Sequence, residues 1–427
     1  MNTLKKINYS RFDEEFYYSK FRNDFQVYII NKPGFVEKTA MLTVNYGSLD
    51  NNFTIRGKQK ENTEGIAHFL EHKLFEDAQG NDISLKFTNL GADVNAFTTF
   101  DKTSYYFSSS NNFIKNLNLL QEFVMTATFT DSSVNREKKI IAQEIDMYLD
   151  DPDYRSYSGI LQNLFPGSSL AMDIAGSKES IEMISAEILR KNYNQFYHPS
   201  QMTLFIVGEV DVEETFESIK LCQANFKRRK PAKAAITSLP YNEVIKTNSL
   251  SMDINIAKVA VGYRGAKCHS NNSLLAYRIA LKFLLAMLFG WTSKNYQNWY
   301  DSGKIDDSFD IEIEIHHDYS FVIITLDSSQ PISMSSKIRK EIEEFQKSKD
   351  INSEHLALLK REMYGDFLQS LDSIEHICNQ FNMFLTSNDN YFDIPTIIEQ
   401  VTLEDIISVG KDFFAKAEVS DFMVFPK

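Results

Sequence analysis

The segment GIAHFLEHKLFE, residues 65–76, constrains the fold of this chain most, because its chemistry requires a helix. It contains His68, Glu71 and His72 in the pattern H-x-x-E-H. Residues three and four apart lie on one face of an α-helix, so a helix places both imidazoles together with the carboxylate beside them. Two such imidazoles can occupy two corners of a tetrahedral Zn²⁺ site, and the carboxylate can accept a proton from an attacking water. The segment predicts a helix to which another element brings a further ligand.

Paired histidines on a helix also occur as ordinary surface or core residues. The chain has only eight histidines among 427 residues, so this five-residue pattern is unexpected by chance. With the glutamate directly before the second histidine, it is the inverted zincin signature. We therefore expect Zn²⁺ as the cofactor and look for a third ligand.

The best candidates for that ligand lie in REKKIIAQEIDMYLDD, within a helix expected at 133–149. Glu137 and Glu144 are seven positions apart, or two helical turns, and so share one face. Glutamates on a helix face are usually only solvated, and the pattern by itself leaves that alternative open.

Charge and cysteine content narrow the functional classes. A formal charge of −13 argues against a nucleic-acid partner. Cys222, Cys268 and Cys378 lie far apart, without the spacing of a metal site or a disulfide framework. They are expected to be buried thiols in a reducing compartment.

No secretory signal or membrane span is expected. The N-terminal residues carry two lysines without a following apolar run. The most apolar segment, residues 275–291, is interrupted by Arg278 and Lys282 and predicts a buried helix. We expect a cytoplasmic protein without a membrane partner.

Both halves of the chain show the same succession: strands, a helix, paired strands, several helices and a closing strand. The basic segment 227–233 separates them and is interpreted as a connector rather than as a nucleic-acid contact. We predict an α+β fold of two similar α/β sandwich domains, each a mixed sheet with helices packed on it, related by internal duplication. The predicted boundaries are 1–228 for the zinc-binding domain, 229–243 for the linker and 244–427 for the second domain.

Further segments carry a family resemblance. They are GSLDN at 47–51, GADVNAFTTFDKTSYY at 91–106, IAGSKESI at 174–181 and YHPSQMTLFIVGEVD at 197–211. Together with H-x-x-E-H and the helix E-x6-E-I, the chain resembles the pitrilysin/insulinase-type zinc peptidases. It is most similar to their short bacterial branch, which resembles mitochondrial processing peptidase. The resemblance implies one half of a clam-shell chamber.

The resemblance also implies roles for particular residues. Glu144 would be the third metal ligand, Glu71 the general base and Glu137 the supporting carboxylate of the catalytic set. The substrate would bind as an added β-strand along Asn95, Ala96, Phe97 and Thr98. Without the resemblance, these four residues would be interpreted as an ordinary strand.

One family feature is missing. Active members use an Arg and a Tyr, seven positions apart, from a second-half domain, but the corresponding stretch 293–309 contains no arginine and has Asp307 near the tyrosine position. Arg361 and Tyr364 have the wrong spacing. We therefore expect a heterodimer with a homologous partner that supplies the Arg/Tyr pair.

Two other functions remain to be distinguished from a zinc endopeptidase for short or unfolded peptides. The chain would be a non-catalytic scaffold or regulatory subunit of a peptidase-like complex if its zinc site were idle. A metal-storage protein is disfavoured, because it has no use for a base beside an open coordination position.

Overall fold

The computed structural model describes residues 3–226, 230–266, 273–386 and 388–427. They form two compact units, each made of three stretches of the chain. Unit 1 contains Met1–Ile145, Asp173–Thr237 and Ser370–Leu385, whereas unit 2 contains Asp146–Met172, Ser238–Gln369 and Thr386–Lys427.

Unit 1 is built on a mixed sheet that has seven strands among the described residues, in the order β1-β2-β3-β9-β4-β8-β7. Only the β3–β9 pair is parallel within this described sheet. Every residue of β9 is buried, so helices and loops cover both faces of the sheet there. The strands are β1 (Lys5–Tyr9), β2 (Glu14–Lys20), β3 (Gln26–Asn31), β4 (Lys38–Val44), β7 (Ala92–Thr98), β8 (Thr103–Ser109) and β9 (Met202–Gly208).

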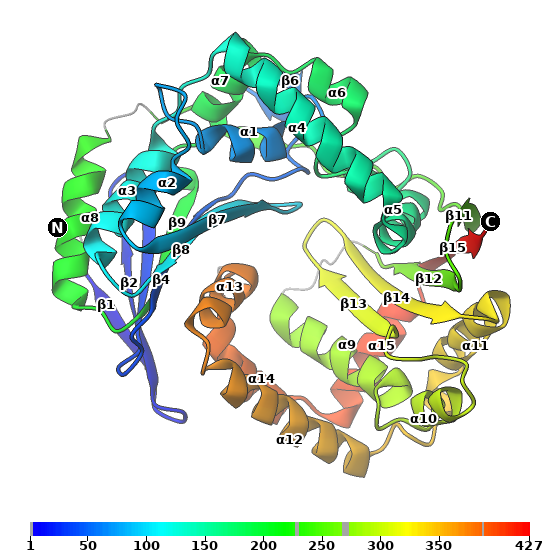
Figure 1. The fold of residues 1–427 in the computed structure, drawn as a ribbon. Coiled ribbons are helices and arrows are strands. Elements are labelled where there is room, and N and C mark those ends of the chain that lie inside the picture. The colour runs from blue at the N-terminus through cyan, green and yellow to red at the C-terminus, as the bar shows by residue number, and fades with distance from the viewer. Residues whose placement is uncertain (1–2, 227–229, 267–272, 387) are drawn as a thin grey trace. The chain divides into compact units, whose positions relative to one another are not determined.

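Helices and a small second sheet complete unit 1 (Figure 1). The small sheet has the order β10-β5-β6, with β5 (Asn52–Ile55), β6 (Lys58–Glu61) and β10 (Ala234–Ile236). The helices are α1 (Ile66–Leu74), α2 (Ser84–Asn89), α3 (Phe113–Met125), α4 (Asp131–Asp150), α6 (Lys178–Glu182), α7 (Ala186–Phe196), α8 (Val212–Asn225) and α13 (Ile374–Phe384), with a 3₁₀ turn η2 (Pro199–Gln201). Helix α4 belongs to unit 1 as far as Ile145, and its last residues belong to unit 2.

Unit 2 contains a sheet of five strands among its described residues, in the order β11-β15-β12-β14-β13. The strands are β11 (Thr247–Met252), β12 (Ala257–Arg264), β13 (Asp310–Ile315), β14 (Ser320–Ser328) and β15 (Glu418–Pro426). The helices are α5 (Pro152–Leu164), α9 (Leu274–Phe289), α10 (Lys294–Asp301), α11 (Pro331–Glu343), α12 (Ser353–Ser370), α14 (Ile394–Gln400) and α15 (Leu403–Phe414), with 3₁₀ turns η1 (Ser169–Ala171), η3 (Phe345–Lys347) and η4 (Tyr391–Asp393).

The two sheets share one topology. In chain order, β3, β4, β7, β8 and β9 of unit 1 correspond to β11, β12, β13, β14 and β15 of unit 2. In both sheets the first and last of these strands pair in parallel, and the other neighbours are antiparallel. The prediction of two mixed-sheet α+β domains of similar fold is therefore confirmed.

Two helices pack on the sheet of the opposite half of the sequence. α13 comes late in the chain but packs on β4 and β9 of unit 1, where Phe381 makes an edge contact with Phe16 of β2. Conversely, α5 packs on β12 and β15 of unit 2. A side chain at Gly159 of α5 would collide with the ring of Phe422, so the missing Cβ permits this close approach. The predicted boundaries, by contrast, divide the chain into contiguous domains.

Other differences from the expected elements are local. β1 and β2 precede the first expected strand, and the helix expected at 178–197 is two helices, α6 and α7. Part of the predicted linker forms β10, which pairs with β5, whereas residues 227–229 lie outside the described residues. Cys222 and Cys378 are buried free thiols, as expected, and Cys268 lies outside the described residues.

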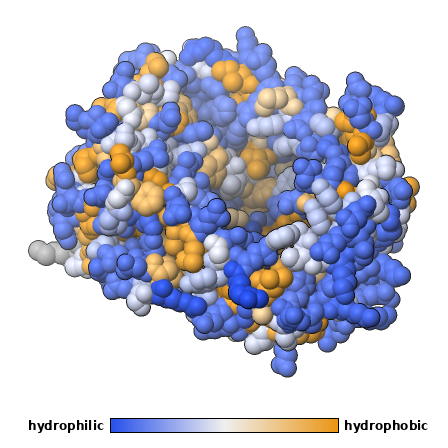
Figure 2. Space-filling model, turned by 60° about the horizontal axis from the view of Figure 1, so that its bottom comes forward, coloured by the Kyte–Doolittle hydropathy of each residue, from blue (hydrophilic) through white to orange (hydrophobic). Residues whose placement is uncertain are grey.

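The surface is mainly hydrophilic on the face that Figure 2 shows, with hydrophobic residues in scattered groups. The apolar segment 275–291 forms the buried helix α9, as predicted. Among the described helices, no single one is long and apolar enough to cross a membrane, although α9 and α10 taken together, bent by 42°, meet that test of length and composition.

Candidate metal centre

The helix that carries H-x-x-E-H begins at a glycine. The N-cap of α1 is Gly65, and it has a positive φ of 81°. A Cβ at this position would also collide with the carbonyl of Ala175, in the segment IAGSKESI. The positive φ and the close approach of Ala175 both require glycine at position 65. The segment IAGSKESI therefore packs directly against the start of α1.

α1 and α4 bring the three predicted metal ligands together. One ligand atom from each of His68, His72 and Glu144 lies within 4.8 Å of the others. Glu144 Oε1 is 3.6 Å from His68 Nε2, and Glu144 Oε2 is 3.5 Å from His72 Nε2. The side chains are 11%, 24% and 20% exposed for His68, His72 and Glu144, respectively, so the site is mostly shielded from solvent.

This donor set fits Zn²⁺. Ligand atoms at the corners of a tetrahedron around zinc, at bond lengths of 2.0–2.1 Å, are about 3.3 Å apart. The two observed nitrogen–oxygen distances of 3.5 and 3.6 Å are close to that value. Two imidazoles and one carboxylate also match the protein ligands of catalytic zinc sites, which keep a fourth position open.

Glu137 orients one of the ligands from behind. Its Oε1 lies 3.0 Å from His72 Nδ1, and an ionised carboxylate only accepts, so Nδ1 is the donor and Nε2 keeps its lone pair for a metal. Burial alone would lower the pKa of His72, but this bond and the neighbouring carboxylates of Glu71, Glu137 and Glu144 outweigh it and raise the pKa. The group is rich in negative charge and therefore suited to a cation.

The predicted base is held by the sheet. Glu71 is buried on α1, and the hydroxyl of Thr98 at the end of β7 donates to its Oε2 at 2.5 Å. None of the described residues donates a hydrogen bond to Oε1, so this oxygen is the freer of the two to take a proton. The predicted role of Thr98 in substrate binding stays a prediction, and the structure adds a contact of its hydroxyl with Glu71 for which the sequence alone gave no signal.

The other predicted substrate residues lie on the edge of the sheet. Asn95, Ala96 and Phe97 belong to β7, the last strand in the order, which pairs with β8 on one side. The Asn95 side chain accepts the backbone N–H of Ala96, and the Phe97 ring contacts Tyr106. Within the described residues, no strand covers the other side of β7, so its backbone can pair with an extended peptide; the binding roles of these residues remain predictions.

Sequence reasoning also missed Lys73, the residue after His72. Its side chain is 0% exposed and forms ion pairs with Glu76 and Glu137. The one signal in the sequence was a lysine between His72 and Leu74 on the helix that carries the motif.

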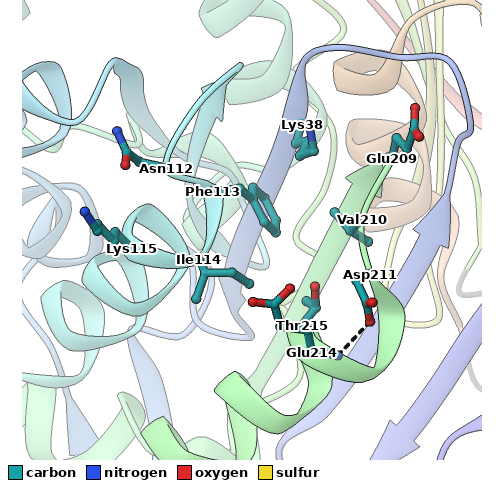
Figure 3. Close-up of a pocket in the computed structure, with 10 residues that line it drawn as sticks. All are labelled: Lys38, Asn112, Phe113, Ile114, Lys115, Glu209, Val210, Asp211, Glu214 and Thr215. Carbon is teal, nitrogen blue, oxygen red and sulfur yellow. Dashed lines mark hydrogen bonds between the residues drawn. The ribbon is translucent and has the colours of Figure 1, made fainter.

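A pocket of about 320 Å³ lies elsewhere in unit 1. Figure 3 shows that α3, α8 and the neighbouring ends of β4 and β9 line it, and that Asp211 caps α8 through the backbone N–H of Glu214. Lys38 pairs in the sheet with Ser109, at the far end of β4 and β8 from Thr103, the partner of Thr98. The pocket is therefore at the opposite end of these strands from the Thr98–Glu71 contact.

Comparisons with known proteins agree with this site. Residues 26–177 match the family described as Insulinase (Peptidase family M16), and residues 183–363 match the Peptidase M16 inactive domain. The chain is 35% identical to "Uncharacterized zinc protease YmfH" of Bacillus subtilis over 99% of its own length and 100% of that protein. Mitochondrial-processing peptidase subunit beta of Dictyostelium discoideum is 27% identical over 42% of this chain and 40% of that protein.

A solved structure supports the same relationship. The crystal structure of an M16-like peptidase from Alicyclobacillus acidocaldarius has a TM-score of 0.91 and 29% sequence identity to this chain. The match covers 97% of this chain and 99% of that one. The similarity in fold therefore extends over nearly the whole chain, and it includes both matched domains.

Proposed function

The chain belongs to the insulinase family of peptidases, peptidase family M16, and on that premise we propose that it is a zinc-dependent endopeptidase for short or unfolded peptides. The observation that carries the proposal is the convergence of His68, His72 and Glu144 beside a base held by Thr98. Relatives named zinc proteases support it.

The residues of the site divide the reaction between them. Zn²⁺ held by His68, His72 and Glu144 would supply a Lewis acid for the scissile carbonyl and acidify a water. Glu71 accepts the proton of the attacking water on Oε1, the oxygen that carries no hydrogen bond from the described residues, while Thr98 donates to Oε2. The same carboxyl then returns the proton to the leaving amine. Glu137 keeps His72 oriented throughout.

Substrate binding uses the edge of the sheet. A peptide that adds to β7 as a further strand pairs with backbone groups of the strand that ends at Thr98, and Thr98 contacts the base. Such pairing selects extended backbone and depends only loosely on side chains. Short or unfolded peptides meet that requirement, whereas folded proteins do not.

The active form is a heterodimer. Residues 293–309 contain no arginine, so this chain does not offer the Arg/Tyr pair of active relatives in the corresponding stretch. The partner is a homologous chain that carries this pair. Purified chain should show full turnover only when such a partner is added; full activity of the zinc-loaded chain alone would contradict the heterodimer.

A variant tests the catalytic proposal against the scaffold alternative. Glu71→Gln should keep zinc, measured by elemental analysis, and lose cleavage of a fluorogenic peptide in the assembly with the partner. If the wild type in that assembly holds zinc but cleaves none of a broad peptide library, the chain is a scaffold subunit.

A further inference from the structure

Lys73 is a buried cation next to the metal site. It lies in the last turn of α1, directly after His72, and its side chain is 0% exposed. Lysine is almost never fully buried unless it is paired, because removing an ammonium group from water is unfavourable. Its location therefore calls for partners that compensate for this cost.

Two carboxylates provide that compensation. The Lys73 ammonium lies 2.5 Å from Glu76 Oε2 and 3.7 Å from Glu137 Oε2. Glu76 Oε1 is in turn 2.9 Å from Arg136 Nη2. Lys73 thus lies between a carboxylate that Arg136 also neutralises and the carboxylate that supports the metal site.

The two oxygens of Glu137 have different partners. Oε1 lies against His72 Nδ1 at 3.0 Å, and Oε2 faces Lys73. A carboxylate held at both oxygens cannot rotate without losing one of its contacts.

The contact between Glu137 and His72 matters because the other imidazole, that of His68, lacks an equivalent one. His68 Nδ1 is buried and has no hydrogen-bond partner among the described residues. Of the two imidazoles, His72 is therefore the one that a hydrogen bond at Nδ1 orients, and Glu137 accepts this bond.

We propose that Lys73 is a positioning residue of the zinc site. It holds Glu137 in the orientation that accepts the Nδ1 proton of His72, and so directs His72 Nε2 toward the other ligands. The proposal rests on the proposed function, because it concerns the affinity of the same site for zinc.

Zinc affinity of the purified full chain tests the proposal without substrate or partner. Competition with a chromophoric chelator gives Kd for the wild type, Lys73→Met, Glu137→Gln and the double variant. Loss of a group that orients a metal ligand weakens binding by about 10- to 100-fold. We expect this loss for each single variant, and no more than about a twofold further loss in the double variant, because Lys73 acts through Glu137.

A control separates positioning from general destabilisation. Leu120, fully buried on α3, can be replaced by Ala to lower the melting temperature without touching the site; its zinc affinity should equal that of the wild type. If Lys73→Met does not fold, Lys73→Gln takes its place, because it is neutral but can still hydrogen-bond to Glu76.

The outcomes are distinguishable. Wild-type protein that binds no zinc contradicts the proposed function itself. Zinc binding by the wild type with unchanged affinity in Glu137→Gln or in the neutral Lys73 variant overturns only the role of Lys73. Losses that add in the double variant also overturn it, since Lys73 would then act independently of Glu137.

Discussion

Replacing Thr98 with Val tests how the general base is held. The change keeps the shape of the side chain and removes the hydroxyl that donates to Glu71 Oε2 at 2.5 Å. A hydrogen bond to a charged group contributes about 1.5–3 kcal/mol. If that bond fixes Glu71 during proton transfer, its loss lowers kcat by roughly 10- to 150-fold, at 1.36 kcal/mol per tenfold change.

The assay is steady-state cleavage of a fluorogenic peptide by the zinc-loaded chain in its assembly with the partner. We expect a fall in kcat with little change in KM, because the hydroxyl contacts the base rather than the peptide. Thr98→Ser keeps the donor and should retain activity within about threefold. Zinc content should be the same in all three proteins.

Two results would refute this reasoning. A rise in KM with unchanged kcat would place the Thr98 hydroxyl on the substrate and not on the base. Equal losses in Thr98→Val and Thr98→Ser would mean that packing at the end of β7, and not the hydrogen bond, is what matters.

Three further outcomes follow from the structure. In the same chelator competition, Glu144→Gln should weaken zinc binding by more than roughly 100-fold, the upper value for loss of a group that only orients a ligand. A smaller loss would argue against Glu144 as a ligand. Burial raises the pKa of Glu312 to about 7, although the hydrogen bond from Tyr157 opposes this shift. The fold thus favours the protonated form of Glu312. Its contribution to the free energy of unfolding is complete below about pH 4.5 and is lost as the pH rises through 7. Glu312→Gln should therefore gain up to about 3 kcal/mol over the wild type between pH 4.5 and 8 in urea unfolding, whereas a pH-independent difference would contradict the shift. Phe381→Ala, at a fully buried position of α13, should cost about 3–5 kcal/mol of unfolding free energy, and a loss below 1 kcal/mol would mean that α13 adds little to unit 1.

The sequence predicted the parts of the site that depend on local spacing. His68, Glu71 and His72 share a face because they are three and four residues apart on one helix. Glu144 was one of two equally plausible glutamates until the family resemblance selected it. The contact between Thr98 and Glu71 joins residues 27 apart in the chain, and it depends on how β7 packs against α1, which no local pattern records.

The fold was predictable to a similar depth. Apolar strands such as β9 and long amphipathic helices such as α4 carry clear periodicity and were expected nearly where they lie. β1 has mostly exposed residues and only a short alternation, so it gave no strand signal. The apolar faces of α5 and α13 predict that each helix packs against another element. Periodicity does not predict which of the two sheets that element belongs to.

The location of α13 sets an order of events during synthesis. The seven described strands of the large sheet in unit 1 are complete once residue 208 has been made, yet the helix that packs on β4 and β9 begins at Ile374. For much of translation, the first half of the nascent chain therefore has an apolar sheet surface that α13 does not yet cover. Such a surface promotes aggregation or the binding of chaperones. A gene fragment that ends after the first half would remain in that state permanently.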